Sequence, residues 1–369
     1  MSILFEPVKI KNMDIRNRFV RSATFDSCAS KTCQVTEKQI HICNELAEGG
    51  VGLIITGATY VHPSGRRFLP QNSITKDNSI PGFKKLTKSV HHRGAKIALQ
   101  LFHGGREAAN FQKTINKLAL APSFIESDPY YAEPHRSMTE DEIWEIIQAF
   151  GDAAKRAREA QFDAVQLHGA HGYLLSQFLS PHTNRREDDW GGALEKRLRF
   201  HHETYLDIRK KVGEDYPILI KFGVQDGFPG GLELREGEAA AQRLAQWGFD
   251  ALEISLGVRG ERFEGTEFRT GIKSLDQEGY FRDWCKRIKR QVDVPMMMMG
   301  GLRTFELMEE VIQKGEADFV SLCRPFVREP GIVNDWIKGN HHRSTCISCN
   351  TCLEAIRSGA ALRCYAPKG

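Results

Sequence analysis

The chain has 369 residues, of which 41% are hydrophobic and 27% are charged, so it can form both a large core and a polar surface. Its formal net charge of +4 is small and spread along the chain, which argues against the clustered basic patch of a nucleic-acid-binding protein. No segment approaches the roughly 20 consecutive apolar residues of a membrane-spanning helix, so we expect no membrane partner.

Short apolar segments alternate with longer amphipathic ones. They predict eight strands, at residues 19–22, 52–56, 96–101, 164–167, 218–221, 251–254, 296–299 and 319–322. The segments between them predict helices, among them 140–160, 194–212, 234–247, 280–291 and 305–313. Eight strand–helix repeats are typical of a closed (β/α)8 TIM barrel in the α/β class, because parallel neighbours need a crossover helix. The alternative is an open, doubly wound sheet, but no glycine fingerprint follows the first strand.

We expect one barrel over residues 1–340 and a short cysteine-rich tail over 341–369. A long loop at 104–137 contains four aromatic residues and is either a lid or a packed insertion. We expect substrate contacts from this loop and from the loop at 257–275. The nine cysteines are an odd number, and four of them lie in the last 24 residues, which argues against a disulfide framework. No signal peptide is visible at the N-terminus, so we expect a reducing, cytoplasmic location.

Functional groups of a β/α barrel lie at the C-terminal ends of its strands. The residues at these predicted positions include Ser22, Ala23, Thr24, Ala58, Gln100, His168, His171, Lys221, Ser255, Gly300, Gly301, Cys323 and Arg324. Gly300 and Gly301 would let backbone N–H groups approach a phosphate, and Arg324 would add further donors. A surface salt bridge is the alternative for Arg324, but the arginine directly follows a predicted strand.

Two histidines and a tyrosine follow the fourth predicted strand. His168 and His171 can converge on one carbonyl or nitro oxygen and favour negative charge on it. Tyr173 has a phenol with a reference pKa of ~10, which suits a proton donor to carbon. A metal site is an alternative, although no third ligand is evident. The remaining alternatives are that the two histidines are structural and that Tyr173 is a core residue.

Residues 166–181, QLHGAHGYLLSQFLSP, resemble the active-site segment of the Old Yellow Enzyme family of FMN-dependent ene-reductases. The likeness continues through 184–192 and includes NRFVRS at 17–22, HGGR at 103–106 and Arg324-Pro325. The resemblance implies an FMN-dependent enzyme that uses NAD(P)H to reduce the C=C bond of a small α,β-unsaturated carbonyl compound. It assigns substrate binding to His168 and His171 and proton donation to Tyr173.

The same resemblance assigns the cofactor contacts. These are, for the flavin ring, Ser22, Ala23, Thr24, Ala58, Gln100 and Lys221, and for the phosphate, Gly300, Gly301, Cys323 and Arg324. Lys221 stands where relatives usually carry arginine, so the charge is kept but the planar fork is lost. Phe25 replaces a cysteine or threonine that tunes the flavin potential, and Ala23 replaces a common proline. We therefore expect non-covalent FMN without that tuning.

The tail contains four cysteines, Cys346, Cys349, Cys352 and Cys364, separated by two, two and eleven residues. This spacing suits a four-thiolate site. It resembles the cluster segment of 2,4-dienoyl-CoA reductase and trimethylamine dehydrogenase, which implies a 4Fe-4S cluster. A structural zinc site is an alternative, because His341 and His342 lie nearby. A tail that binds no metal is another alternative.

Three further functions compete with ene-reduction. One is a metal-dependent hydrolase on the same barrel, and another is an electron-transfer protein centred on the tail. The third is a dienoyl-thioester reductase or an amine dehydrogenase-like flavoprotein with an external electron partner. A homo-oligomer is compatible with all of them.

Overall fold

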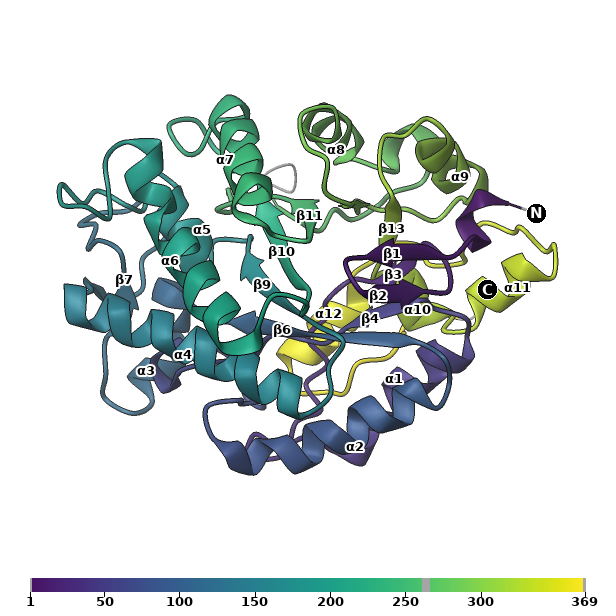
Figure 1. Ribbon diagram of the computed structural model, residues 1–369, viewed down its shortest axis with the longest axis horizontal. Coiled ribbons are helices and arrows are strands. Elements are labelled where there is room, and N and C mark those ends of the chain that lie inside the picture. Colours follow the sequence, from purple (N-terminus) through teal and green to yellow (C-terminus); the bar gives the residue numbers. More distant parts are fainter. Residues whose placement is uncertain (1, 261–265, 368–369) are drawn as a thin grey trace.

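The computed structural model describes residues 2–260 and 266–367 (Figure 1). Eight parallel strands close into a barrel in the order β4-β3-β13-β12-β11-β10-β9-β6, with β6 pairing back to β4. They are β3 (Phe19–Arg21), β4 (Leu53–Ile55), β6 (Lys96–Phe102), β9 (Ala164–Gly169), β10 (Ile218–Gly223), β11 (Ala251–Ser255), β12 (Met296–Met298) and β13 (Phe319–Leu322). The predicted TIM barrel is confirmed, and each strand boundary lies within two residues of its prediction.

Helices cover the outside of the barrel, and the last one, in the tail, lies at its mouth (Figure 1). They are α1 (Glu37–Glu48), α2 (Ile80–His91), α3 (Ala109–Lys113), α4 (Glu140–Glu159), α5 (Leu174–Leu179), α6 (Leu194–Val212), α7 (Leu234–Trp247), α8 (Arg282–Lys289), α9 (Phe305–Gln313), α10 (Arg324–Arg328), α11 (Ile332–Ile337) and α12 (Thr351–Arg357). Helix α8 is two residues shorter at each end than its prediction. The residue before its start, Phe281, is not helical (φ −108°, ψ 9°), and the Tyr280 N–H binds the Gly300 carbonyl at 3.1 Å.

Helix α4 shows how the sequence sets an element. Thr139 and Glu142 form a capping box, which satisfies backbone N–H groups at the first turn. Ile143, Ile147 and Phe150 are then buried on one face, as a helical repeat of apolar residues requires. The helix packs against the neighbouring α6.

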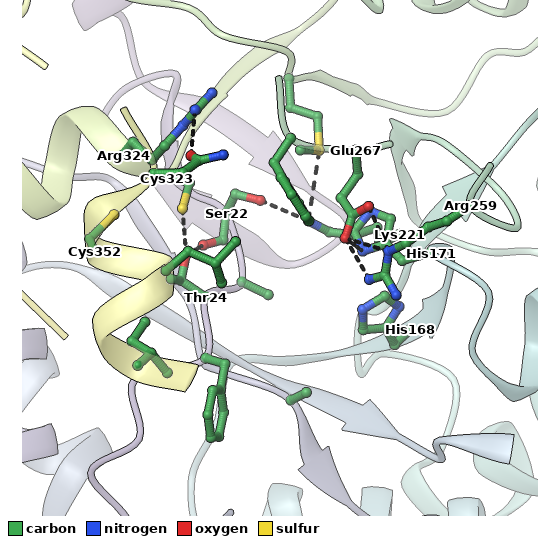
Figure 2. Close-up of a pocket in the computed structure, with 18 of the residues that line it drawn as sticks. Ser22, Thr24, His168, His171, Lys221, Arg259, Glu267, Cys323, Arg324 and Cys352 are labelled. Carbon is green, nitrogen blue, oxygen red and sulfur yellow. Dashed lines mark hydrogen bonds and ion pairs between the residues drawn. The ribbon is translucent and has the colours of Figure 1, made fainter. Parts of the chain in front are cut away.

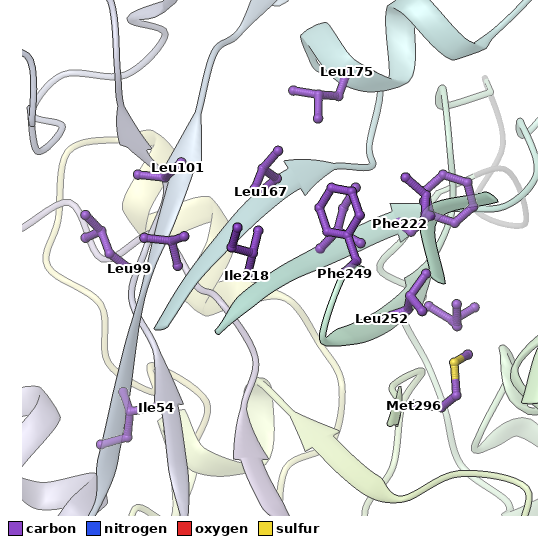
Figure 3. Packing of buried hydrophobic residues seen from close by; sticks show 14 of the residues in the cluster. Ile54, Leu99, Leu101, Leu167, Leu175, Ile218, Phe222, Phe249, Leu252 and Met296 are labelled. Atoms are coloured by element: carbon purple, nitrogen blue, oxygen red, sulfur yellow. The ribbon is translucent and has the colours of Figure 1, made fainter. Parts of the chain in front are cut away.

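The core has two layers because strand side chains alternate between the faces of the sheet. The inner layer has residues from all eight barrel strands: Val20, Leu53, Ile55, Ala98, Ala164, Leu219, Ala251, Met297 and Phe319. Ile10, Met13 and Ile15 pack against this layer from a hairpin of β1 (Val8–Ile10) and β2 (Met13–Ile15). The outer layer includes Ile54, Leu99, Leu167, Ile218 and Leu252, drawn in Figure 3.

The remaining segments gather at the C-terminal ends of the barrel strands. The 104–137 loop contains a small sheet of β7 (Ala119–Ala121) and β8 (His135–Ser137), while β5 (Thr59–Tyr60) lies beside β6. The tail is tied to the loops after three strands, since Leu362 N–H binds the Asp26 carbonyl, Ser344 N–H binds that of Arg303 and Gly271 N–H binds that of Ser348. None of the helices in the described residues is long and apolar enough to cross a membrane.

Candidate active site

A cavity of about 690 Å³ lies at the mouth of the barrel (Figure 2), within the ~300–1,000 Å³ usual for ligand sites. All the catalytic and cofactor residues predicted from the sequence line it: Ser22, Ala23, Thr24, Ala58, Gln100, His168, His171, Tyr173, Lys221, Gly300, Gly301, Cys323 and Arg324. In Figure 2 the histidines and Lys221 lie toward one side, and Cys323 and Arg324 lie toward the other. The cavity therefore has two chemically different ends.

At the first end, the rings of His168, His171 and Tyr173 face one another. The centroids of the two imidazoles are 4.9 Å apart with an interplanar angle of 83°. The Tyr173 ring lies 4.7 Å from His168 and 4.6 Å from Phe102, edge to face in both contacts. His171 has a left-handed φ of 62°, held by a hydrogen bond from its N–H to the Leu256 carbonyl at 2.9 Å. The turn after β9 thus directs both imidazoles into the cavity.

Both histidines are neutral at physiological pH. Burial, reinforced by the charge of Lys221, holds the pKa of each imidazole well below its ordinary value. The Ser255 hydroxyl lies 2.7 Å from Nε2 of His171 and donates to it when the proton is on Nδ1. Nδ1 of His168 is buried and has no hydrogen-bond partner among residues 2–260 and 266–367. The pair therefore offers neutral imidazole groups to a ligand.

Lys221 is 2% exposed and lies in a buried polar network. Its Nζ is 2.7 Å from Ser22 Oγ and 3.2 Å from a Glu253 carboxylate oxygen. Burial by itself would raise the pKa of Glu253, but Lys221 and hydrogen bonds from Ser321, Ser22 and Gln166 hold it below the usual value. Gln100 is also tied to the network, because it donates to Gln166 at 2.8 Å.

The second end of the cavity has exposed backbone and basic side chains. Gly300 and Gly301 have φ values of 123° and 75°, which favour glycine. A Cβ on Gly300 would lie 3.0 Å from the Phe281 nitrogen. Arg324 Nη1 is held at 2.7 Å by the Arg269 carbonyl and at 2.7 Å by Asn350 Oδ1. Backbone N–H groups and a fixed guanidinium suit a phosphate.

Several lining residues were not predicted. Arg259 and Glu267 form a partly buried ion pair with a shortest N–O distance of 2.5 Å, and Arg259 Nη2 lies 3.4 Å from the Tyr173 hydroxyl. Arg67 lies over the Tyr173 ring at 5.2 Å and pairs with Glu107. Glu107, Arg259 and Glu267 lie in the two loops from which substrate contacts are expected, but neither loop has a periodic pattern that would single out these residues. Residues 261–265 of the 257–275 loop, from which we expected substrate contacts, lie outside the described residues.

The four tail cysteines line one small cavity of about 30 Å³, together with Arg324 and Arg328. Cys352 and Arg324 line the large cavity as well, so the two spaces are neighbours. Arg328 Nη1 lies 3.4 Å from Cys364 Sγ. Within the part of the chain that the structure describes, no three His, Cys, Asp or Glu side chains are grouped to hold one metal ion.

Residues 3–342 match the model of the NADH:flavin oxidoreductase / NADH oxidase family. The chain belongs to this family. It is 36% identical to an NADH oxidase of Thermoanaerobacter brockii over 357 residues, covering 94% of this chain and 52% of that protein. It is 31% identical to a cinnamate reductase of Clostridium sporogenes over 385 residues, covering 98% of this chain and 57% of the relative.

Among solved structures, a 2-naphthoyl-CoA reductase superimposes with a TM-score of 0.91 at 27% identity. The match covers 98% of this chain and 56% of that protein. The chain therefore spans little more than half the length of these members of the family. The expected resemblance to flavin oxidoreductases is confirmed.

Proposed function

We propose that this chain carries the FMN site of an oxidoreductase that reduces the C=C bond of α,β-unsaturated carbonyl compounds with electrons from NAD(P)H. The observation that carries the proposal is the group of His168, His171 and Tyr173, whose rings lie within 6.5 Å of one another on one cavity wall. Membership of a flavin oxidoreductase family supports it. So does the relative named cinnamate reductase, because cinnamate is α,β-unsaturated.

The donor set of the cavity fits FMN. Lys221 would place a cation beside the flavin ring, which Ser22, Ala23, Thr24, Ala58 and Gln100 would line, and Gly300, Gly301, Cys323 and Arg324 would hold the phosphate. The unpartnered Nδ1 of His168 is a polar atom that a ligand can satisfy. Phe25 stacks on Phe68 at 4.4 Å and offers no hydrogen bond, so FMN would be held without a covalent link at this position. When bound, FMN supplies the hydride that is added to the double bond.

The protein's own residues would orient and protonate the substrate. His168 and His171 would donate hydrogen bonds to the carbonyl oxygen and stabilise the negative charge that builds on it. Tyr173 would give its phenolic proton to the α-carbon. The Arg259 guanidinium near its hydroxyl favours the negative oxygen that remains. Leu256 and Ser255, which bind His171, keep the imidazole in this position.

A His171→Ala variant tests the proposal. Protein loaded with FMN is reduced without oxygen and mixed with 2-cyclohexenone, and reoxidation is followed by absorbance. Loss of one hydrogen-bond donor to the oxygen should slow this step about 100-fold. The exposed His41 provides a control, His41→Ala, which should react as fast as the wild type. Equal rates for His171→Ala and wild type, or protein that binds no FMN, would contradict the proposal.

Comparison of thioesters with free acids identifies the class of carbonyl substrate more closely. We propose a thioester as the alternative substrate, because the fold is so similar to that of a 2-naphthoyl-CoA reductase. The ratio of kcat/KM for cinnamoyl-CoA to that for cinnamate decides between the two. A ratio well above one supports the thioester, and a ratio below one supports the acid.

We also propose that Cys346, Cys349, Cys352 and Cys364 bind a 4Fe-4S cluster that exchanges electrons with an external partner. All four line one cavity, and Cys352 borders the proposed flavin site. A cluster binds each thiolate through a different iron, so its ligands lie further apart than those of a single ion. Protein purified without oxygen should contain iron and sulfide, and Cys352→Ser should lose much of both. Zinc, or no metal, would contradict this assignment.

A further inference from the structure

A second cavity, of about 480 Å³, lies between the loop after β5 and helix α4. It shares no lining residue with the cavity at the barrel mouth. Its lining consists of His62, Ser64, Gln112, Lys117, Leu118, Leu120, Arg136, Glu142, Glu145 and Ile146. It thus combines a hydroxyl, an imidazole and a carboxylate with a short apolar wall.

Ser64, His62 and Glu145 form a continuous chain of polar contacts. Ser64 Oγ lies 2.7 Å from His62 Nδ1, and His62 Nε2 lies 3.3 Å from a Glu145 carboxylate oxygen. A nucleophile beside a base that is oriented by a third group is the arrangement of acyl-transfer enzymes. The His62 side chain is 25% exposed, so the base is partly shielded from water.

The surrounding hydrogen bonds fix the direction of every proton in this chain. The Gly105 N–H donates to His103 Nδ1 at 3.0 Å, so the neutral His103 ring carries its proton on Nε2 and donates to Ser64 Oγ at 2.9 Å. Burial lowers the pKa of His103 to about 3, which keeps that ring neutral. His62 Nδ1 accepts the Ser64 backbone N–H at 3.3 Å and therefore carries no proton, so the Ser64 hydroxyl donates to it, and His62 Nε2–H donates to Glu145.

The local fold holds Ser64 in place. It lies on a short 3-10 turn, Pro63–Gly65, whose carbonyls at Pro63 and Ser64 accept from the buried Gln112 amide at 3.0 and 3.1 Å. A Cβ on Gly65 would lie 2.5 Å from the His103 ring, so only glycine lets that histidine reach the serine. The His62 ring also caps this turn by accepting the Ser64 N–H at 3.3 Å. Capping of the turn accounts for the position of His62 Nδ1, but it does not require a carboxylate beside the other ring nitrogen, Nε2.

We propose that Ser64, His62 and Glu145 are the nucleophile, base and orienting acid of a second, hydrolytic site that cleaves small carboxylic esters. Leu118, Leu120 and Ile146 would receive a short apolar acyl group. Lys117 lines the cavity and has no carboxylate partner in the described part of the chain. Burial is the main cause that lowers the pKa of His62, and the charge of Lys117 lowers it further, whereas Glu145 raises it. The ammonium would stabilise the oxyanion.

The reaction is balanced with water as the second reactant. Ser64 Oγ attacks the ester carbonyl while its proton passes to His62 Nδ1, and the bond to the alcohol oxygen breaks as His62 returns that proton to it. Water then attacks the acyl group on Ser64 and gives a proton to His62. The carboxylic acid leaves, and the proton restores the Ser64 hydroxyl. Glu145 stabilises the charged imidazole in both halves.

Hydrolysis of p-nitrophenyl butyrate by the full chain tests the proposal. Loss of the nucleophile in Ser64→Ala, or of the base in His62→Gln, should lower kcat/KM about 100-fold. A fluorophosphonate probe should add to Ser64 in the wild type, and peptide mass spectrometry should place the adduct there. FMN content and the rate of enone reduction should stay unchanged, because neither residue lines the flavin cavity.

Two matched control variants distinguish catalysis at this site from nonspecific hydrolysis by other serines and histidines. Ser89→Ala removes a serine that binds Asn44, and His41→Gln removes a histidine paired with Glu45 without a serine. Both should keep the wild-type rate. The proposal is overturned if Ser64→Ala and His62→Gln, each with normal FMN content, hydrolyse the ester as fast as the wild type. It is equally overturned if no adduct forms on Ser64.

Discussion

Lys221 and Glu253 face each other in the interior at 3.2 Å, on the adjacent strands β10 and β11. Both are buried, and Ser22 and Ser321 complete their hydrogen bonding. Removing one partner of such a pair leaves an uncompensated charge in a medium of low dielectric constant. The change costs about 3–5 kcal/mol of folding free energy.

We predict that Lys221→Met destabilises the protein by roughly that amount. Urea unfolding followed by circular dichroism measures it. The double variant Lys221→Met/Glu253→Gln should recover part of the loss, because the charge of Glu253 is then gone as well. A single variant as stable as the wild type would show that Glu253 is not charged in the folded protein.

The sequence predicts a role for Lys221 in the site, because this residue ends an apolar strand. It predicts no role for Glu253. Glu253 lies in the middle of the strand ALEIS at 251–255. A charged residue inside an otherwise apolar strand is itself a signal of a buried partner. Which residue it pairs with depends on the register of two strands, which aligns Lys221 with Glu253.

At the level of elements, helix α6 buries an imidazole that has no partner. Both ring nitrogens of His201 lack a hydrogen bond within the described ranges, and the side chain is fully buried. Burial lowers the pKa of His201 to about 3, compared with 6.5 for an unburied histidine. The unfolded chain therefore binds a proton between these values that the folded protein does not bind. Stability falls as the pH drops through this window.

We predict that His201→Leu makes unfolding less sensitive to acid. Each such histidine contributes a slope of up to about 1.4 kcal/mol per pH unit below pH ~6.5. Thermal melting between pH 7 and pH 4 measures the difference, and the variant should also gain about 1 kcal/mol at pH 7 by losing unsatisfied polar atoms. The exposed His41→Leu should leave the slope unchanged. An identical slope for His201→Leu would contradict the prediction.

The elements themselves follow closely from the sequence. Helices α6, α7 and α9 begin and end at the predicted residues, since apolar periodicity and polar flanks mark both ends. Helix α8 begins two residues later than predicted, because the backbone of Phe281 is not helical, with φ −108° and ψ 9°. The Tyr280 N–H before it binds the carbonyl of Gly300 on a different segment, a contact that a local pattern does not reveal.

At the scale of the whole molecule, the tail completes the wall of the large cavity. Ile356 of α12 is 7% exposed and lines the cavity, while Ile347 on the same tail is 58% exposed. The tail is tied to the loops after β3, β11 and β12 by backbone hydrogen bonds. The barrel mouth is therefore shaped by residues far beyond the last barrel strand.

We predict that Ile356→Asp weakens FMN binding about tenfold or more, equivalent to a loss of at least ~1.4 kcal/mol. A buried carboxylate without a partner would push the tail away from the cavity. Recovery of flavin fluorescence on dilution measures the affinity. Ile347→Asp is the matched control and should bind FMN as the wild type does. Equal affinities for the two variants would show that the tail does not shape the site.

The sequence by itself determined the barrel, its eight strands and five of its helices to within two residues, and the residues at the strand ends that line the cavity, because periodicity and position after a strand are local properties. Only the tertiary structure decided which charges meet. It paired Lys221 with Glu253, and Arg259 with Glu267. It also brought the turn at Ser64 against α4 and the tail against the mouth. Except for Arg259 with Glu267, which lie on one loop, these contacts join segments distant in the chain, whose approach depends on how the barrel closes.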